Sequence, residues 1–161
     1  MRLALFQPDI AGNVGTVLRT AACLGVPVDL IEPMGFAWSH RALARAGMDY
    51  AAQAEVVRHA DWAAFAAQVT GRMVLLTTAG ATPLPAARFE TGDVLLLGSE
   101  SAGVPDVVHQ RADLRVRVPM RPGFRSLNVA VAGAMVLAEA LRQTGWPGMD
   151  DPSSFTPAPD C

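Results

Sequence analysis

The chain has 161 residues, 51% of them hydrophobic, which suits one globular domain with its own core and leaves no room for a second full domain. Thirteen basic and fifteen acidic residues give a formal net charge of −2, which argues against a monomer that holds nucleic acid by bulk positive charge. No apolar run reaches the roughly 18 residues that a membrane-spanning helix needs, and the chain opens like a strand rather than a signal peptide, so we expect a cytoplasmic protein.

The chain begins with an apolar run, Leu3 to Phe6, that predicts a strand. A turn containing Asn13 follows, and then a helix from Val14 to Leu24 that Gly25 closes. Asn13 suits the cap of a helix whose backbone donors face a phosphate, with Arg19 nearly two turns further along. An ordinary capped helix with a solvated arginine fits the same spacing, so this loop alone leaves both interpretations open.

The middle of the chain alternates apolar runs with helical patterns. The runs predict strands at Val28 to Ile31, Met73 to Thr77 and Val94 to Leu97. Helices are expected at His40 to Ala46, closed by Gly47, and at Asp61 to Gln68, with Asp61 as its cap. This alternation is typical of an α/β fold with a mostly parallel sheet flanked by helices.

A loop with two glycines, Gly98 and Gly103, follows the most apolar of these strands. Glycines allow the backbone to approach a ligand closely. Glu100 comes just after the strand, where a carboxylate is costly unless it is paired or hydrogen-bonded. The alternative is a simple turn with Glu100 in water, and the loop by itself does not decide between them.

The last part of the chain predicts a strand at Leu114 to Val118, a Pro/Gly loop and a long helix from Leu127 to Thr144. Ser126 or Asn128 could simply cap this helix. Two arginines beside Met120 and Phe124 also suit an anionic or aromatic ligand; they are Arg121 and Arg125.

Several common sites are missing from the sequence. Neither the Rossmann glycine pattern, nor a P-loop, nor a Gly-x-Ser-x-Gly elbow occurs. His40, His59 and His109 lack the spacing of metal ligands, and Cys23 and Cys161 indicate neither a disulfide framework nor a zinc site. We therefore expect no metal.

In order and spacing, the three loops resemble the three motifs of the SPOUT methyltransferase superfamily, and more closely its small tRNA (cytidine/uridine) 2′-O-methyltransferases that act on the wobble nucleotide. The strings are Asn13-x-Gly15-x-x-x-Arg19, Gly98-Ser99-Glu100-Ser101-x-Gly103, and Pro119-Met120 with Arg125-Ser126-Leu127-Asn128. Pro33-x-Gly35-Phe36 and Arg45-Ala46-Gly47-x-Asp49-Tyr50 resemble the wobble subgroup. The similarity covers residues 1–147, taken as one domain, and we expect the Pro-, Asp- and Ser-rich residues 148–161 to be a disordered tail.

The resemblance implies an α/β fold with a deep C-terminal trefoil knot, a homodimer and S-adenosylmethionine as cofactor. The residues that it places against the cofactor are Leu76, Thr77, Gly98, Val118, Ser126 and Asn128. The chain departs from the family at Ala102, where many members carry arginine, and at Ala130-Val131, where many carry Ser-Asn.

The implied reaction is transfer of a methyl group to the 2′-hydroxyl of tRNA nucleotide 34, in leucine isoacceptors. The resemblance points to Arg19 for activation, with Asn13 and Glu100 orienting Arg19 and the ribose. Because arginine stays protonated, we expect Arg19 to stabilise the developing alkoxide or to enlist an RNA phosphate as proton acceptor. The candidates for RNA contact are Arg41, Arg45, Tyr50, Arg121 and Arg125.

Three alternatives stay open at this point. The enzyme could methylate another tRNA or rRNA site, or the chain could be a non-catalytic RNA-binding module of the same fold. A flavodoxin-like nucleotide-binding domain is disfavoured by the missing phosphate loop.

Overall fold

The computed structural model describes residues 1–38 and 53–148. The expected helix from His40 to Ala46 lies outside the described residues, as do the RNA-contact candidates Arg41, Arg45 and Tyr50. All but the first residue of the expected tail also lies outside them.

Seven strands form one sheet in the order β3-β2-β1-β6-β4-β7-β5, and every strand pair in it is parallel. The strands are β1 (Arg2–Phe6), β2 (Val28–Ile31), β3 (Val56–His59), β4 (Met73–Leu76), β5 (Thr82–Pro83), β6 (Val94–Leu97) and β7 (Leu114–Arg117). This confirms the expected α/β fold with a parallel sheet.

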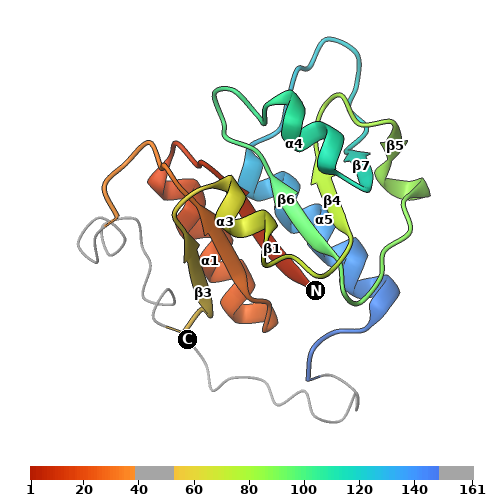
Figure 1. Ribbon diagram of the computed structural model, residues 1–161. Helices are drawn as coiled ribbons and strands as arrows, with labels where there is room; N and C mark the ends of the chain where they lie inside the picture. The colour runs from red at the N-terminus through yellow and green to blue at the C-terminus, as the bar shows by residue number, and fades with distance from the viewer. Residues whose placement is uncertain (39–52, 149–161) are drawn as a thin grey trace, which may run out of the picture.

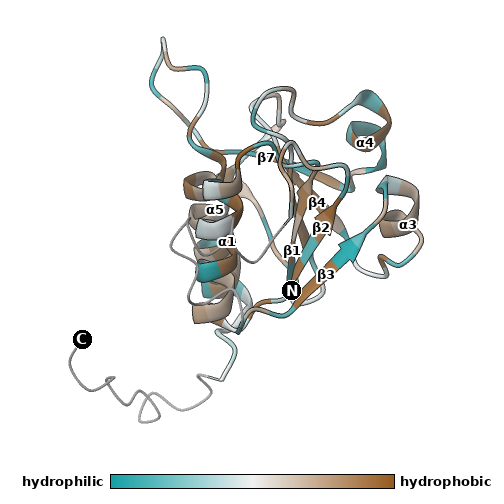
Figure 2. Cartoon of the chain, turned by 90° about the vertical axis from the view of Figure 1, so that its left-hand side faces the viewer, coloured by the Kyte–Doolittle hydropathy of each residue, from teal (hydrophilic) through white to brown (hydrophobic). Residues whose placement is uncertain are grey.

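Helices cover both faces of the sheet (Figures 1 and 2). On one face α1 (Ala11–Leu24) and α5 (Val129–Thr144) pack against each other. The short helices α3 (Trp62–Ala66) and α4 (Asp106–Arg111) lie on the other face, and a 3₁₀ turn, η1 (Leu84–Ala86), follows β5. Within residues 1–38 and 53–148, no helix is both long and apolar enough to cross a membrane.

The two helical layers explain why the central strands are mostly apolar on both faces. Successive side chains of a strand point to opposite faces, so Leu3 and Leu5 of β1 join the core under α1 and α5, whereas Ala4 and Phe6 join the core under α3 and α4. The central strand β6 is buried along its whole length. Two of the three loops singled out in the sequence start at the carboxyl ends of the buried strands β1 and β6, and the third follows β7, of which only Val116 is buried.

The helix caps agree with the predictions at three positions and differ at one. Gly25 closes α1 in the left-handed conformation, Asp61 accepts the backbone N–H of Ala64 at the start of α3, and Asn128 rather than Ser126 caps α5. The capping prediction for Asn13 was wrong, because α1 already begins at Ala11. The Asn13 side chain lies in the first turn and is available for other contacts.

Candidate active site

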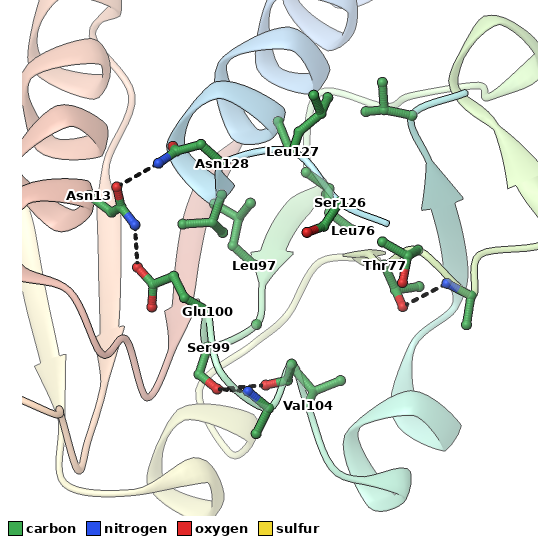
Figure 3. Close-up of a pocket in the computed structure, with 18 of the residues that line it drawn as sticks. Asn13, Leu76, Thr77, Leu97, Ser99, Glu100, Val104, Ser126, Leu127 and Asn128 are labelled. Carbon is green, nitrogen blue, oxygen red and sulfur yellow. Dashed lines mark hydrogen bonds between the residues drawn. The ribbon is translucent and has the colours of Figure 1, made fainter. Parts of the chain in front are cut away.

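A cavity of about 680 Å³ lies at the carboxyl ends of β4, β6 and β7, beside the first turn of α5 (Figure 3). This volume is within the range of roughly 300 to 1,000 Å³ that is usual for small-ligand sites. All six residues expected to hold the cofactor line it: Leu76, Thr77, Gly98, Val118, Ser126 and Asn128. The three loops therefore surround one cavity.

The walls of the cavity are mostly aliphatic. Leu97, Val104, Val116, Leu127 and Val129 are among the lining residues. Glu100 and Asn13 lie at the end next to α1. The cavity thus combines an apolar wall, which suits an aromatic ring, with a polar rim that carries one carboxylate.

Gly98 and Gly103 have a role within their own loop. A Cβ atom at Gly98 would lie 2.7 Å from the carbonyl carbon of Gly103, and Ser99 and Gly103 exchange two backbone hydrogen bonds of 2.9 Å. Gly103 itself has φ +69, a conformation that favours glycine. Gly98 therefore makes room for the folded-back loop, and both glycines also line the cavity.

A chain of hydrogen bonds joins the three loops (Figure 3). Asn13 Nδ2 donates to Glu100 Oε1 at 2.7 Å, and Asn128 Nδ2 donates to Asn13 Oδ1 at 2.9 Å. Asn128 Oδ1 accepts the backbone N–H of Ala130 and of Val131 at the start of α5. Glu100 is therefore hydrogen-bonded to neighbouring loops rather than only to water, and Asn128 both caps α5 and bonds Asn13.

In this series of hydrogen bonds, each amide nitrogen and oxygen can take only one role. An ionised carboxylate only accepts hydrogen bonds, so Asn13 must present its amide nitrogen to Glu100 and its oxygen to Asn128. Asn128 must then donate its amide nitrogen and keep its oxygen for the helix. The orientation of both amides follows from the charge of Glu100.

Asp9 is a residue of this site that sequence analysis missed. Its backbone N–H donates to Glu100 Oε2 at 2.8 Å, and its Oδ2 accepts from Ser101 through the hydroxyl at 2.5 Å and the backbone N–H at 3.0 Å. These two bonds, first the hydroxyl's and then the backbone's, lower the pKa of the Asp9 carboxyl. His109 of α4 also lines the cavity and was missed, because the histidines were considered only as metal ligands.

The described arginine candidates lie outside this cavity. Arg19 is exposed on α1, and Arg121 and Arg125 are exposed in the loop between β7 and α5. Arg121 borders a second, smaller hollow with Phe124 and Met135. Among the described residues, no cluster of His, Cys, Asp and Glu could hold a metal ion.

Comparison with known proteins places this geometry among RNA methylases. Residues 1–138 match the SpoU rRNA Methylase family. A protein of Beijerinckia indica subsp. indica, named tRNA (cytidine(34)-2'-O)-methyltransferase, is 55% identical over 146 residues, which cover 89% of this chain and 91% of that protein.

Two solved structures resemble the chain closely. One, described as giving insights into the 2-OH methylation of C/U34 on tRNA, is 42% identical with a TM-score of 0.84 and covers 88% of this chain and 94% of its own. An AdoMet-bound rRNA methyltransferase from Sinorhizobium meliloti is 28% identical with a TM-score of 0.77, over 88% of this chain and 55% of its own.

Proposed function

The chain belongs to the SpoU rRNA methylase family, and on that premise we propose that it transfers a methyl group from S-adenosylmethionine to the 2′-hydroxyl of nucleotide 34 of tRNA, in leucine isoacceptors. The observation that carries the proposal is the hydrogen-bonded chain from Asp9 through Glu100 and Asn13 to Asn128, on the rim of a cavity of cofactor size. The names of the relatives supply the tRNA nucleotide. We place the reaction in the cytoplasm.

The residues around the cavity fit S-adenosylmethionine. Its adenine would lie against the aliphatic wall formed by Leu76, Val116 and Val118, and its positive charge would favour the end of the cavity where Glu100 lies. Ser126 and Thr77 add hydroxyl groups to the wall. When bound, the cofactor supplies an electrophilic methyl group; the chain must align the 2′-oxygen and help it to lose its proton.

Arg19 is proposed to assist the loss of that proton by stabilising the developing alkoxide or by holding an RNA phosphate that accepts the proton. Arg19 is exposed and outside the cavity of its own chain. A homodimer would allow Arg19 of one protomer to serve the cavity of its partner. Asn13 and Glu100 would then orient the ribose from the side of the cavity to which they belong.

An exposed apolar surface supports the proposed homodimer. Val131 and Met135 lie one turn apart on α5 and Leu127 lies just before its cap; the exposed fractions of Leu127, Val131 and Met135 are 42, 49 and 42%. Phe124 in the preceding loop is 70% exposed. Exposed apolar side chains of this kind suit an interface with a second copy, which would also bring arginines of two chains to one RNA.

Two finer features belong to the same proposal. The loop from β7 to α5 is expected to complete a trefoil knot, as the resemblance to the SPOUT superfamily implies. Arg121 and Arg125 in this loop, together with Arg41, Arg45 and Tyr50, are proposed to contact the RNA.

The test is methylation of a tRNA(Leu) transcript with S-adenosylmethionine, followed by nuclease digestion and mass spectrometry. We expect one added methyl on nucleotide 34. The matched control is the same tRNA with a 2′-deoxynucleotide at position 34, which should gain none. A methyl group elsewhere in tRNA or rRNA would correct the substrate, whereas RNA binding without cofactor heat in calorimetry would identify a non-catalytic module.

A further inference from the structure

Asp9 bonds both the side chain of Glu100 and the residue that follows Glu100 in the chain. Its backbone N–H bonds Glu100 Oε2, while Asn13 bonds the other oxygen, Oε1. Its own carboxylate bonds the backbone N–H and the hydroxyl of Ser101, the residue after Glu100. Residue 100 is thus fixed both through its side chain and through the backbone that carries it.

The loop after β2 braces Asp9 in turn. Gly35 donates its backbone N–H to the carbonyl oxygen of Pro8 at 3.0 Å. A Cβ at Gly35 would lie 2.9 Å from Asp9 Cα and 3.2 Å from Asp9 Oδ1, so only glycine allows this approach without movement of the Asp9 backbone. This gives a physical role to the Pro33-x-Gly35-Phe36 string, which the cavity itself does not use.

We infer that Asp9 is a positioning residue for methyl transfer: its carboxylate fixes Ser101, and thereby the carboxylate of Glu100 at the rim of the cavity, while Gly35 packs closely against the Asp9 backbone. The inference rests on the proposed function. Because Asp9 acts through Glu100, its removal should slow the chemical step while the aliphatic wall of the cavity stays unchanged. A displacement of about 1 Å at a reacting group can cost up to about 100-fold in rate.

The experiment compares Asp9→Ala with Asp9→Asn in the full chain. Both Ser101 bonds end on a single oxygen, Oδ2, which the amide oxygen of asparagine can replace. We expect Asp9→Ala to lose about 10-fold or more in single-turnover methylation, with S-adenosylhomocysteine affinity within about 3-fold of wild type, and Asp9→Asn to recover most of the rate. Asp106→Ala is the control, because Asp106 is an exposed aspartate at the start of α4.

A double-mutant cycle with Glu100→Ala decides whether Asp9 acts through Glu100. If it does, Asp9→Ala should cost almost nothing further when Glu100 is absent. Losses that multiply, a wild-type rate in Asp9→Ala, or no recovery in Asp9→Asn would overturn the inference. Should Asp9→Ala melt markedly lower than wild type, Ser101→Ala, which removes only the hydroxyl bond, must show the same selective loss of rate on a smaller scale. Failure of the wild-type chain to bind S-adenosylhomocysteine would instead contradict the proposed function.

Discussion

The carboxylate of Glu100 accepts hydrogen bonds on both of its oxygens, one from a backbone N–H and one from an amide side chain. Neither donor can reverse its role while its other bonds persist, because Asn13 uses its oxygen for Asn128. The requirement at position 100 is therefore for two acceptors rather than for size or polarity. Glutamine has the same shape but offers only one acceptor.

Glu100→Gln is expected to damage the site despite its conservative shape. Whichever way the new amide turns, its NH₂ faces either the Asp9 N–H or Asn13 Nδ2, and one donor loses its partner. An unsatisfied donor at a half-buried site costs about 1 kcal/mol in the free energy of unfolding, which a denaturant titration can measure. Methylation in single turnover should fall about 10-fold or more.

The control for this variant is Glu55→Gln, because the Glu55 side chain is 70% exposed and only borders Arg2 at 3.9 Å. Its stability and rate should match the wild type. If Glu100→Gln behaved like Glu55→Gln, the charge at position 100 would not set the direction of the hydrogen bonds.

Arg19 offers a second comparison between similar side chains. If its guanidinium stabilises the alkoxide or holds a phosphate by paired bonds, both Arg19→Lys and Arg19→Ala should lose at least roughly 100-fold in single-turnover rate, with cofactor affinity kept. A lysine variant within a few-fold of wild type would reduce Arg19 to an electrostatic RNA contact. In that case the alanine variant should mainly weaken RNA binding and lower its salt dependence.

Among the elements, those buried on both faces were predictable. Helices cover both faces of β6, so all of its residues are apolar, and this continuous apolar run predicted the strand. The edge strand β3 was missed because Arg58 interrupts its short apolar run and is exposed. The six-residue helix α4 was missed because it buries a single residue, Val108, and the polar residues that follow Val108 leave no helical hydrophobic pattern.

The sequence predicted part of the cavity lining, but it did not predict the hydrogen bonds between those residues. The similarity of motifs identified Asn13, Glu100 and Asn128 as candidates, and all three line the cavity. Their hydrogen bonds link residues 87 and 115 positions apart, and no local pattern specifies such a pairing. Asp9 was missed for the same reason, since its partners lie 91 and 92 positions away.

The loop after β6 allows a prediction that separates loop shape from ligand contact. Gly98→Val should abolish S-adenosylhomocysteine binding in calorimetry and also lower the melting temperature, because Cβ would collide with the Gly103 backbone and force the loop to refold. Gly12→Ala is the control, because a Cβ atom there would meet nothing within 4 Å. Replacing glycine by alanine in a helix increases the free energy of unfolding by up to about 1 kcal/mol. Lost binding at an unchanged melting temperature would show that the side chain blocks the ligand directly.

For the whole molecule, the distribution of charge matters more than its sum. The chain is slightly acidic, yet Arg19, Arg121 and Arg125 are all exposed. Arg121 borders the same hollow as the apolar side chains of Phe124, Leu127 and Met135. Two copies joined there would bury apolar area and place six of these arginines on one particle, which a single copy cannot do.

The proposal that each site is shared between two chains can be tested with mixed dimers. Arg19→Ala and Glu100→Ala should each be nearly inactive alone. In a mixed dimer, the cavity of the Arg19→Ala chain keeps its own Glu100 and can receive Arg19 of the partner subunit, whereas the other cavity lacks both. Random pairing makes half of the dimers mixed, so co-refolded equal amounts should recover about a quarter of the wild-type sites in a single-turnover burst. If Arg19 served the cavity of its own chain instead, each cavity would always lack one of the two residues, and mixing would recover nothing.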